Sequence, residues 1–92
     1  MGGEMTHPTP APGDLLAEFN GWRLERKDAK QRPIWFLFRV VSADGLLQYK
    51  GAFDGARFGS GRDMAHLRRS EPSVFVWVAK ELRRLWDEGG LM

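Results

Sequence analysis

The chain of 92 residues has no cysteine. This absence excludes disulfide bonds, thiolate metal sites and a cysteine nucleophile. It also fits a reducing compartment, so a cytoplasmic location is expected. Long apolar runs are missing too, since none approaches the roughly 20 residues that span a bilayer. No basic region followed by an apolar stretch begins the sequence, so we expect neither a secretory signal nor a membrane partner.

Groups that carry catalysis or bind metals are sparse. No cluster of histidines or carboxylates has the spacing of a metal site. Ser60, Asp63 and His66 are close in sequence, but a single loop rarely supplies the geometry of a catalytic triad. The sequence therefore predicts a protein that is not an enzyme, with no catalytic residue, no metal ligand and no cofactor.

The composition supports one small folded domain. Hydrophobic residues make up 42% of the chain and include four tryptophans and six phenylalanines. Residues 1–13 are rich in proline and have almost no large apolar group, which predicts a disordered N-terminal tail. Residues 14–92 are then expected to form a single domain. Because a body of this size buries little of its surface, dimerisation would help it.

The charge is slightly basic. The formal net charge is +2, and ten of the fourteen basic residues are arginine. Arginine suits the recognition of phosphates and carboxylates better than lysine does. A GC-rich coding sequence would also raise the arginine content, so the bias alone does not define a site.

The N-terminal half of the domain contains several short elements. Asp14 can cap a short helix whose apolar stripe, which includes Leu15 and Phe19, ends at Asn20-Gly21. Residues 22–27 alternate between apolar and charged, which predicts a half-buried strand. Aromatic and β-branched residues predict a second strand over 34–41. A third strand, 46–53, follows the Asp44-Gly45 pair, which is a strong hairpin signal.

A two-residue loop at Asp44-Gly45 fixes the register of this hairpin. One face then contains Ile34 and the pairs Phe36–Phe53, Phe38–Gly51 and Val40–Tyr49, and we predict that this face lies toward the core. The other face contains the pairs Leu37–Ala52, Arg39–Lys50 and Val41–Gln48, with Trp35 near Asp54. That face is either simply solvated or a shallow basic surface edged by Trp35.

The C-terminal segment is predicted to be the main helix. Ser70 would cap it, Pro72 is tolerated in its first turn, and Gly89-Gly90 would end it. Residues 73–78 alone could also form a strand, but the longer pattern has helical period. On a helical wheel the apolar stripe comprises Phe75, Val78, Ala79, Leu82, Leu85 and Trp86, with Val74 at its edge; Val76, Trp77, Lys80, Arg83, Arg84 and Asp87 lie outside it.

A glycine-rich loop precedes this helix, with a second short helix that Asp63 would cap. The predicted fold class is therefore α+β: a three-stranded antiparallel meander packed against a C-terminal α-helix, with a short N-terminal helix.

The leading hypothesis for function is a non-enzymatic interaction module. It would bind a protein partner, or a second copy of itself, through the outer face of the C-terminal helix, because tryptophan and arginine often carry binding energy at interfaces. The residues of this predicted surface are Val76, Trp77, Lys80 and Arg84.

Two alternatives remain open. One is a nucleic-acid-binding protein that uses the basic sheet face or the arginine-rich loop 57–69. The other is an anion site in the glycine-rich loop 55–61. The residues of the nucleic-acid alternative are Trp35, Arg39, Lys50, Arg57, Arg62, Arg68 and Arg69.

Overall fold

A computed structural model of the chain describes residues 15–27 and 35–89. The predicted tail, Asp14 and Ile34 lie outside this part. The described residues form four strands and two helices in the order β1, β2, β3, β4, α1, α2. Their bounds are β1 Leu15–Phe19, β2 Trp22–Arg26, β3 Phe36–Val41, β4 Gln48–Phe53, α1 Arg62–Ser70 and α2 Pro72–Asp87.

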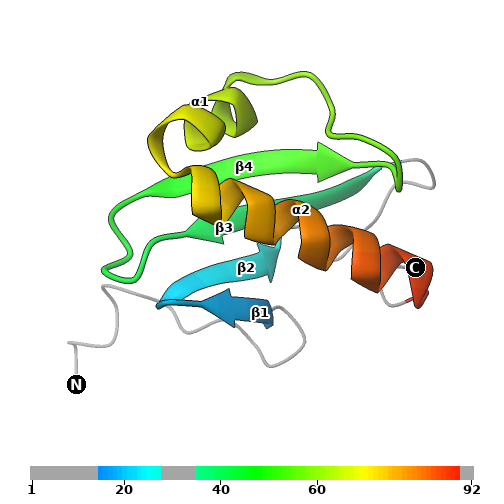
Figure 1. The fold of residues 1–92 in the computed structure, drawn as a ribbon, viewed down its shortest axis with the longest axis horizontal. Helices are drawn as coiled ribbons and strands as arrows, with labels where there is room; N and C mark the ends of the chain where they lie inside the picture. The colour runs from blue at the N-terminus through cyan, green and yellow to red at the C-terminus, as the bar shows by residue number, and fades with distance from the viewer. Residues whose placement is uncertain (1–14, 28–34, 90–92) are drawn as a thin grey trace.

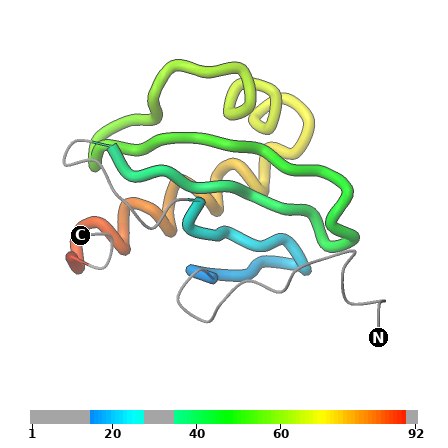
Figure 2. The backbone as a smooth tube through the Cα atoms, turned by 180° about the vertical axis from the view of Figure 1, so that it is seen from behind, coloured from blue at the N-terminus to red at the C-terminus, as the bar shows by residue number. Residues whose placement is uncertain are grey.

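The strands form one antiparallel sheet in sequence order, β1-β2-β3-β4. α2 crosses one face of this sheet, and α1 lies beside β4 at its edge (Figure 1). Seen from behind, the other face carries none of the described helices (Figure 2). The α+β class, the antiparallel meander and the C-terminal helix are therefore confirmed, but the sheet has four strands rather than three.

The predicted N-terminal helix is wrong, because Leu15–Phe19 forms the edge strand β1. Asn20 and Gly21 have φ angles of 50° and 84° and join Phe19 directly to its partner Trp22. A two-residue Asn-Gly turn with positive φ at both positions matches the twist of antiparallel strands. The pair is thus a hairpin turn rather than a helix stop, and a run of five residues is too short to stabilise a helix against that pairing.

The register of the β3–β4 hairpin is confirmed at all six predicted pairs, from Phe36–Phe53 to Val41–Gln48. Its loop is longer than predicted. The Ser42 N–H donates to the Leu47 carbonyl over 2.9 Å, and the Gly45 N–H donates to the Ser42 carbonyl over 2.9 Å. Asp44 and Gly45 therefore lie inside a four-residue loop, 43–46.

The hydrophobic core lies between one face of the sheet and the two helices. The side chains of Phe38 and Val40 are fully buried, as predicted for this face of the hairpin. The other buried apolar residues of the sheet are Leu24, Phe36, Tyr49 and Phe53, and those of the helices are Met64, Leu67, Val74, Val78 and Leu82.

The C-terminal segment is one continuous helix from Pro72 to Asp87, so the alternative of a strand over 73–78 is wrong. Ser70 does not cap α2, because it is the last residue of α1. Glu71 alone joins the two helices, as the C-cap of α1 and the N-cap of α2. Pro72 follows in the first turn, where its missing N–H costs no helical hydrogen bond.

Asp63 is not a cap either. α1 begins at Arg62 with Gly61 as its N-cap, and Asp63 lies inside the first turn. Its carboxylate instead accepts a 2.8 Å hydrogen bond from the backbone N–H of Lys50 in β4. This contact satisfies an outward-facing group of an edge strand, which would otherwise be open to pairing with another chain.

The packing of Phe38 against Gly51 generates a prediction for stability. A Cβ added at Gly51 would lie 2.5 Å from the Phe38 Cζ, and the Phe38 ring is fully buried. We expect Gly51→Ala to lower the free energy of unfolding by about 1–2 kcal/mol through overpacking.

Chemical denaturation measures this change. Gly61→Ala is the matched control, because a Cβ there meets nothing within 4 Å. Because Gly61 is the N-cap of α1, where alanine is a poorer cap than glycine, this substitution should lower the free energy of unfolding by about 0.5 kcal/mol, which is less than the effect of Gly51→Ala. Equal effects of the two substitutions would contradict the packing argument.

Candidate functional site

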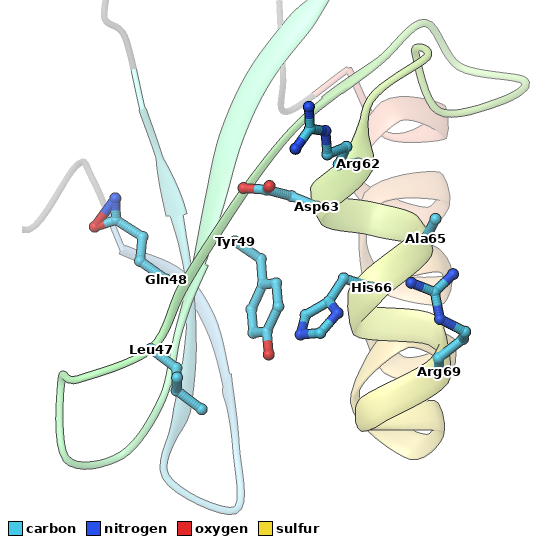
Figure 3. A pocket seen from close by; sticks show the side chains of 8 residues that line it. All are labelled: Leu47, Gln48, Tyr49, Arg62, Asp63, Ala65, His66 and Arg69. Carbon is cyan, nitrogen blue, oxygen red and sulfur yellow. The ribbon is translucent and has the colours of Figure 1, made fainter.

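A groove of about 530 Å³ lies between α1 and the β3–β4 hairpin (Figure 3). We call it the α1 groove. β4 and the loop before it form one wall, and α1 forms the other. Its lining residues are Leu47, Gln48, Tyr49, Arg62, Asp63, Ala65, His66 and Arg69.

Three contacts from α1 set the geometry of the groove. The buried side chains of Met64 and Leu67 hold the helix on the core. Asp63 bonds to the β4 backbone, and the rings of Tyr49 and His66 face each other with centroids 5.7 Å apart (Figure 3). The exposed residues of α1 that line the groove are Arg62, Ala65, His66 and Arg69.

The electrostatics of the groove are positive. Arg62 and Arg69 are seven residues apart, which is two helical turns or about 10 Å along the axis. Among the described residues, neither guanidinium has a carboxylate within ion-pair distance or a side-chain hydrogen bond. Asp63 is the one carboxylate in the lining, and it already accepts the Lys50 N–H. Within residues 15–27 and 35–89, these two guanidinium groups therefore have no charged side-chain partner.

The hairpin loop beside the groove is stiffened by its own hydrogen bonds. The Ser42 hydroxyl donates to the Asp44 carboxylate over 2.6 Å and accepts the Leu47 N–H over 3.0 Å. The Asp44 carboxylate also accepts the Leu46 N–H over 3.0 Å. These bonds, the one from Ser42 first, lower the pKa of Asp44 below its usual value. They support the loop above that usual pKa, and the support is lost as acid protonates the carboxylate.

This loop exposes two large apolar side chains. Leu46 is 77% exposed and Leu47 is 48% exposed, and Leu47 also borders the groove. In the strand predicted over 46–53, two adjacent leucines would point to opposite sides, so the sequence contained a signal that one of them faces water. The prediction of candidate site residues missed both.

The remaining residues of the predicted nucleic-acid surface do not gather in this groove. Arg39 donates to Glu25 over 2.7 Å, and Glu25 also pairs with Arg23 over 2.9 Å. Glu18 lies 3.6 Å from Arg23, so two carboxylates balance the two arginines. Trp35 is half-buried and Lys50 is exposed. The basic sheet face is therefore less positive than its sequence suggests.

Two further arginines have other surroundings. The guanidinium of Arg68 lies 5.8 Å from the centre of the Phe75 ring, so it braces the junction between the helices. Arg57 is exposed and lies 3.9 Å from the carboxylate of Asp54. Backbone N–H bonds from Arg57 and Ala56 lower the pKa of Asp54, which stabilises the loop rather than a ligand site.

The glycine-rich loop forms a smaller hollow on the other side of Asp63. This hollow has a volume of about 210 Å³ and is lined by residues that include Lys50, Ser60 and Gly61. The anion site proposed for loop 55–61 stays a prediction.

The structure places Trp77 differently from the helical wheel. The buried residues of α2 are Val74, Val78 and Leu82, so the apolar stripe is centred closer to Trp77 than expected. Trp77 is half-buried and stacks on Phe19 of β1, with ring centroids 5.4 Å apart and an interplanar angle of 23°. The edge strand that was predicted as a helix is therefore what covers this tryptophan.

The other residues of the predicted partner surface lie outside the core. Val76 is 49% exposed, and Lys80 is exposed. Arg84 pairs with Glu81 over 2.7 Å and with Glu88 over 3.1 Å, and these carboxylates raise the pKa of the guanidinium. Glu81 and Glu88 lie three residues before and four residues after Arg84, so these pairs occupy Arg84 within its own helix.

The described part of the chain has neither a group of metal ligands nor a membrane-spanning helix. Residues 15–27 and 35–89 contain no group of three or more metal-ligating side chains. Neither helix in these ranges has the length and apolar character needed to cross a membrane.

Comparison with known proteins gives no relative from which a function could be transferred. No protein-family model, no curated protein and no solved structure matches the chain.

The contact between Trp77 and Phe19 generates a prediction. We expect Trp77→Ala to lower the free energy of unfolding by about 2–3 kcal/mol, because it removes apolar contacts within the subunit. Val76→Ala, one residue away and exposed, should change it by less than about 0.5 kcal/mol. Urea unfolding at several protein concentrations measures both changes. A Trp77→Ala chain as stable as the wild type would show that Phe19 does not hold the tryptophan.

Proposed function

We propose that this protein is a non-enzymatic nucleic-acid-binding module that contacts phosphates through the α1 groove. The observation that carries the proposal is the pair Arg62 and Arg69, which line one groove without a side-chain partner among the described residues. The formal charge of +2 supports the same direction.

Arginine in this setting favours phosphate over other anions. Its planar fork of N–H donors matches the oxygens of a phosphate, and it stays charged at every physiological pH. The single acidic side chain of the groove, Asp63, is bound to the Lys50 N–H and so is held toward β4. Repulsion between an approaching phosphate and this carboxylate is reduced by that arrangement.

The spacing of the two arginines favours a polymer over a small anion. Arg62 and Arg69 are two helical turns apart, about 10 Å along the axis, so the two side chains can contact two separate phosphates. A nucleic-acid backbone offers phosphates in series, and each additional contact releases counterions and adds affinity. The groove is therefore suited to a strand whose successive phosphates lie along α1.

Binding to short fluorescent duplex DNA, single-stranded DNA and RNA tests this proposal by anisotropy. We expect the wild-type chain to bind at low salt and to weaken steeply as salt is raised. The double variant Arg62→Ala/Arg69→Ala should bind more weakly and should reduce the slope of log affinity against log salt by about 2.

A matched control distinguishes this site from general charge. Lys80→Ala/Arg83→Ala also removes two positive charges, but from exposed positions on α2 that do not line the groove. We expect it to keep most of the affinity and most of the salt slope. Equal losses in the two double variants would show that net charge alone drives binding, and no binding at low salt would end the proposal.

A second candidate function is the leading hypothesis from the sequence, in which a protein partner or a second copy binds at the outer face of α2. The observation that favours it is the 49% exposure of Val76, next to the exposed Lys80. Its contact area no longer includes the full Trp77 ring. If this face forms a homodimer, light scattering should give twice 10.5 kDa for the wild type and 10.5 kDa for Val76→Glu.

A further inference from the structure

The β3–β4 hairpin presents apolar side chains to water on a stiffened loop. Leu46, at 77%, has the largest exposed fraction of the large apolar residues that the structure describes as exposed. Its backbone N–H is bonded to Asp44, and the backbone N–H of Leu47 is bonded to Ser42. A leucine pair that cannot easily fold back onto the domain remains available to another molecule.

The position of the two leucines relates them to the arginines. Leu47 lines the α1 groove together with Arg62 and Arg69 (Figure 3). Leu46 directly precedes it in the sequence, in the loop 43–46 of the hairpin. Whatever fills the groove must therefore offer negative charge to the helix wall and an apolar surface to the loop. The two requirements lie side by side on one molecule.

We propose that the tip of this hairpin is an apolar wedge that enters between stacked base pairs of duplex DNA held at the α1 groove. This inference rests on the proposed function, since it specifies the form of nucleic acid and the response of that nucleic acid. Leu46 is the leading side chain of the wedge, and Leu47 follows it from the groove side.

Duplex DNA combines the two surfaces that the site requires. Its phosphates lie at the rim of the minor groove, and the apolar faces of its base pairs become accessible when a step is partly unstacked. Proteins that bind the minor groove use leucine, among other apolar residues, to open a base step, while arginines engage the groove and backbone. A single strand needs no wedge, because its bases are already apart.

The hydrogen bonds of the loop are what make a wedge effective. Opening a base step costs free energy, so the inserting side chain must hold its position against the stack. Ser42 and Asp44 together fix the N–H groups of both leucines, and the Ser42 N–H and the Leu47 carbonyl close the base of the loop over 2.9 Å. The leucines are therefore pre-positioned, and little order is lost when they insert.

Duplexes labelled at both ends report bending by energy transfer, and 2-aminopurine within the duplex reports unstacking. We expect the wild-type chain to bend the duplex by an angle in the range of about 20–90° and to raise the 2-aminopurine fluorescence. Leu46→Ala/Leu47→Ala should bind with an unchanged salt slope but leave the duplex straight and stacked. Both leucines are exposed, so this variant should fold, and its thermal unfolding verifies that.

Two further variants make the result specific. Ser42→Ala removes the hydroxyl that links Asp44 and the Leu47 N–H, so it should bend DNA less than the wild type although both leucines remain. Val76→Ala also shortens an exposed apolar side chain, but on α2, and it should bend DNA as the wild type does.

The outcomes separate the wedge from the proposed function. A wild-type chain that binds duplex DNA through Arg62 and Arg69 but leaves it straight and stacked would overturn the wedge and leave the proposed function standing. A chain that binds no nucleic acid would overturn both. Loss of self-association, rather than of bending, in Leu46→Ala/Leu47→Ala would assign the leucines to a second copy of the chain and would also overturn the wedge.

Discussion

The hydrogen bond from the Lys50 N–H to the Asp63 carboxylate ties α1 to the outer edge of β4, and the candidate site depends on it. Further along the same edge, the Gly59 N–H donates to the Ala52 carbonyl over 2.8 Å. An edge strand closed in this way has fewer free backbone groups. The same contacts place the exposed residues of α1 beside the hairpin. The bonds that occupy the backbone groups of the edge strand therefore also form the groove.

The core of the hairpin was predictable, because local rules agree with one another there. The register was predicted by placing the turn at Asp44-Gly45, and the structure has that register although its loop is longer. The four-residue loop 43–46 has the same centre as the predicted two-residue loop, so every later pair is unchanged. The first strand was not predicted, because Asn20-Gly21 suits both a helix end and a two-residue turn. Only the neighbouring strand decides between them, and pairing between separate segments is not encoded in a local pattern.

For the candidate site, the sequence predicted which residue types would take part but not which of them lie together. Arg62 and Arg69 were singled out because they are arginines, but so were Arg39 and Arg68, whose charges the structure directs to Glu25 and to the Phe75 ring. What distinguishes the two groups is the partner that folding brings to each side chain. The partial burial of Trp77 has the same origin, since Phe19 reaches it from a segment nearly sixty positions earlier in the chain.

A single residue, Glu71, separates the two helices, and contacts on both sides of it reinforce the junction. The Glu71 N–H donates to the Leu67 carbonyl over 2.7 Å, the Phe75 N–H donates to the Glu71 carbonyl over 3.0 Å, and Arg68 covers the Phe75 ring. These contacts restrict the angle between α1 and α2. The junction therefore sets the direction in which α2 leaves α1, and α2 carries Trp77 to the β1 edge of the sheet, where its indole stacks on Phe19. A connection of one residue thus links the packing at the two opposite edges of the sheet.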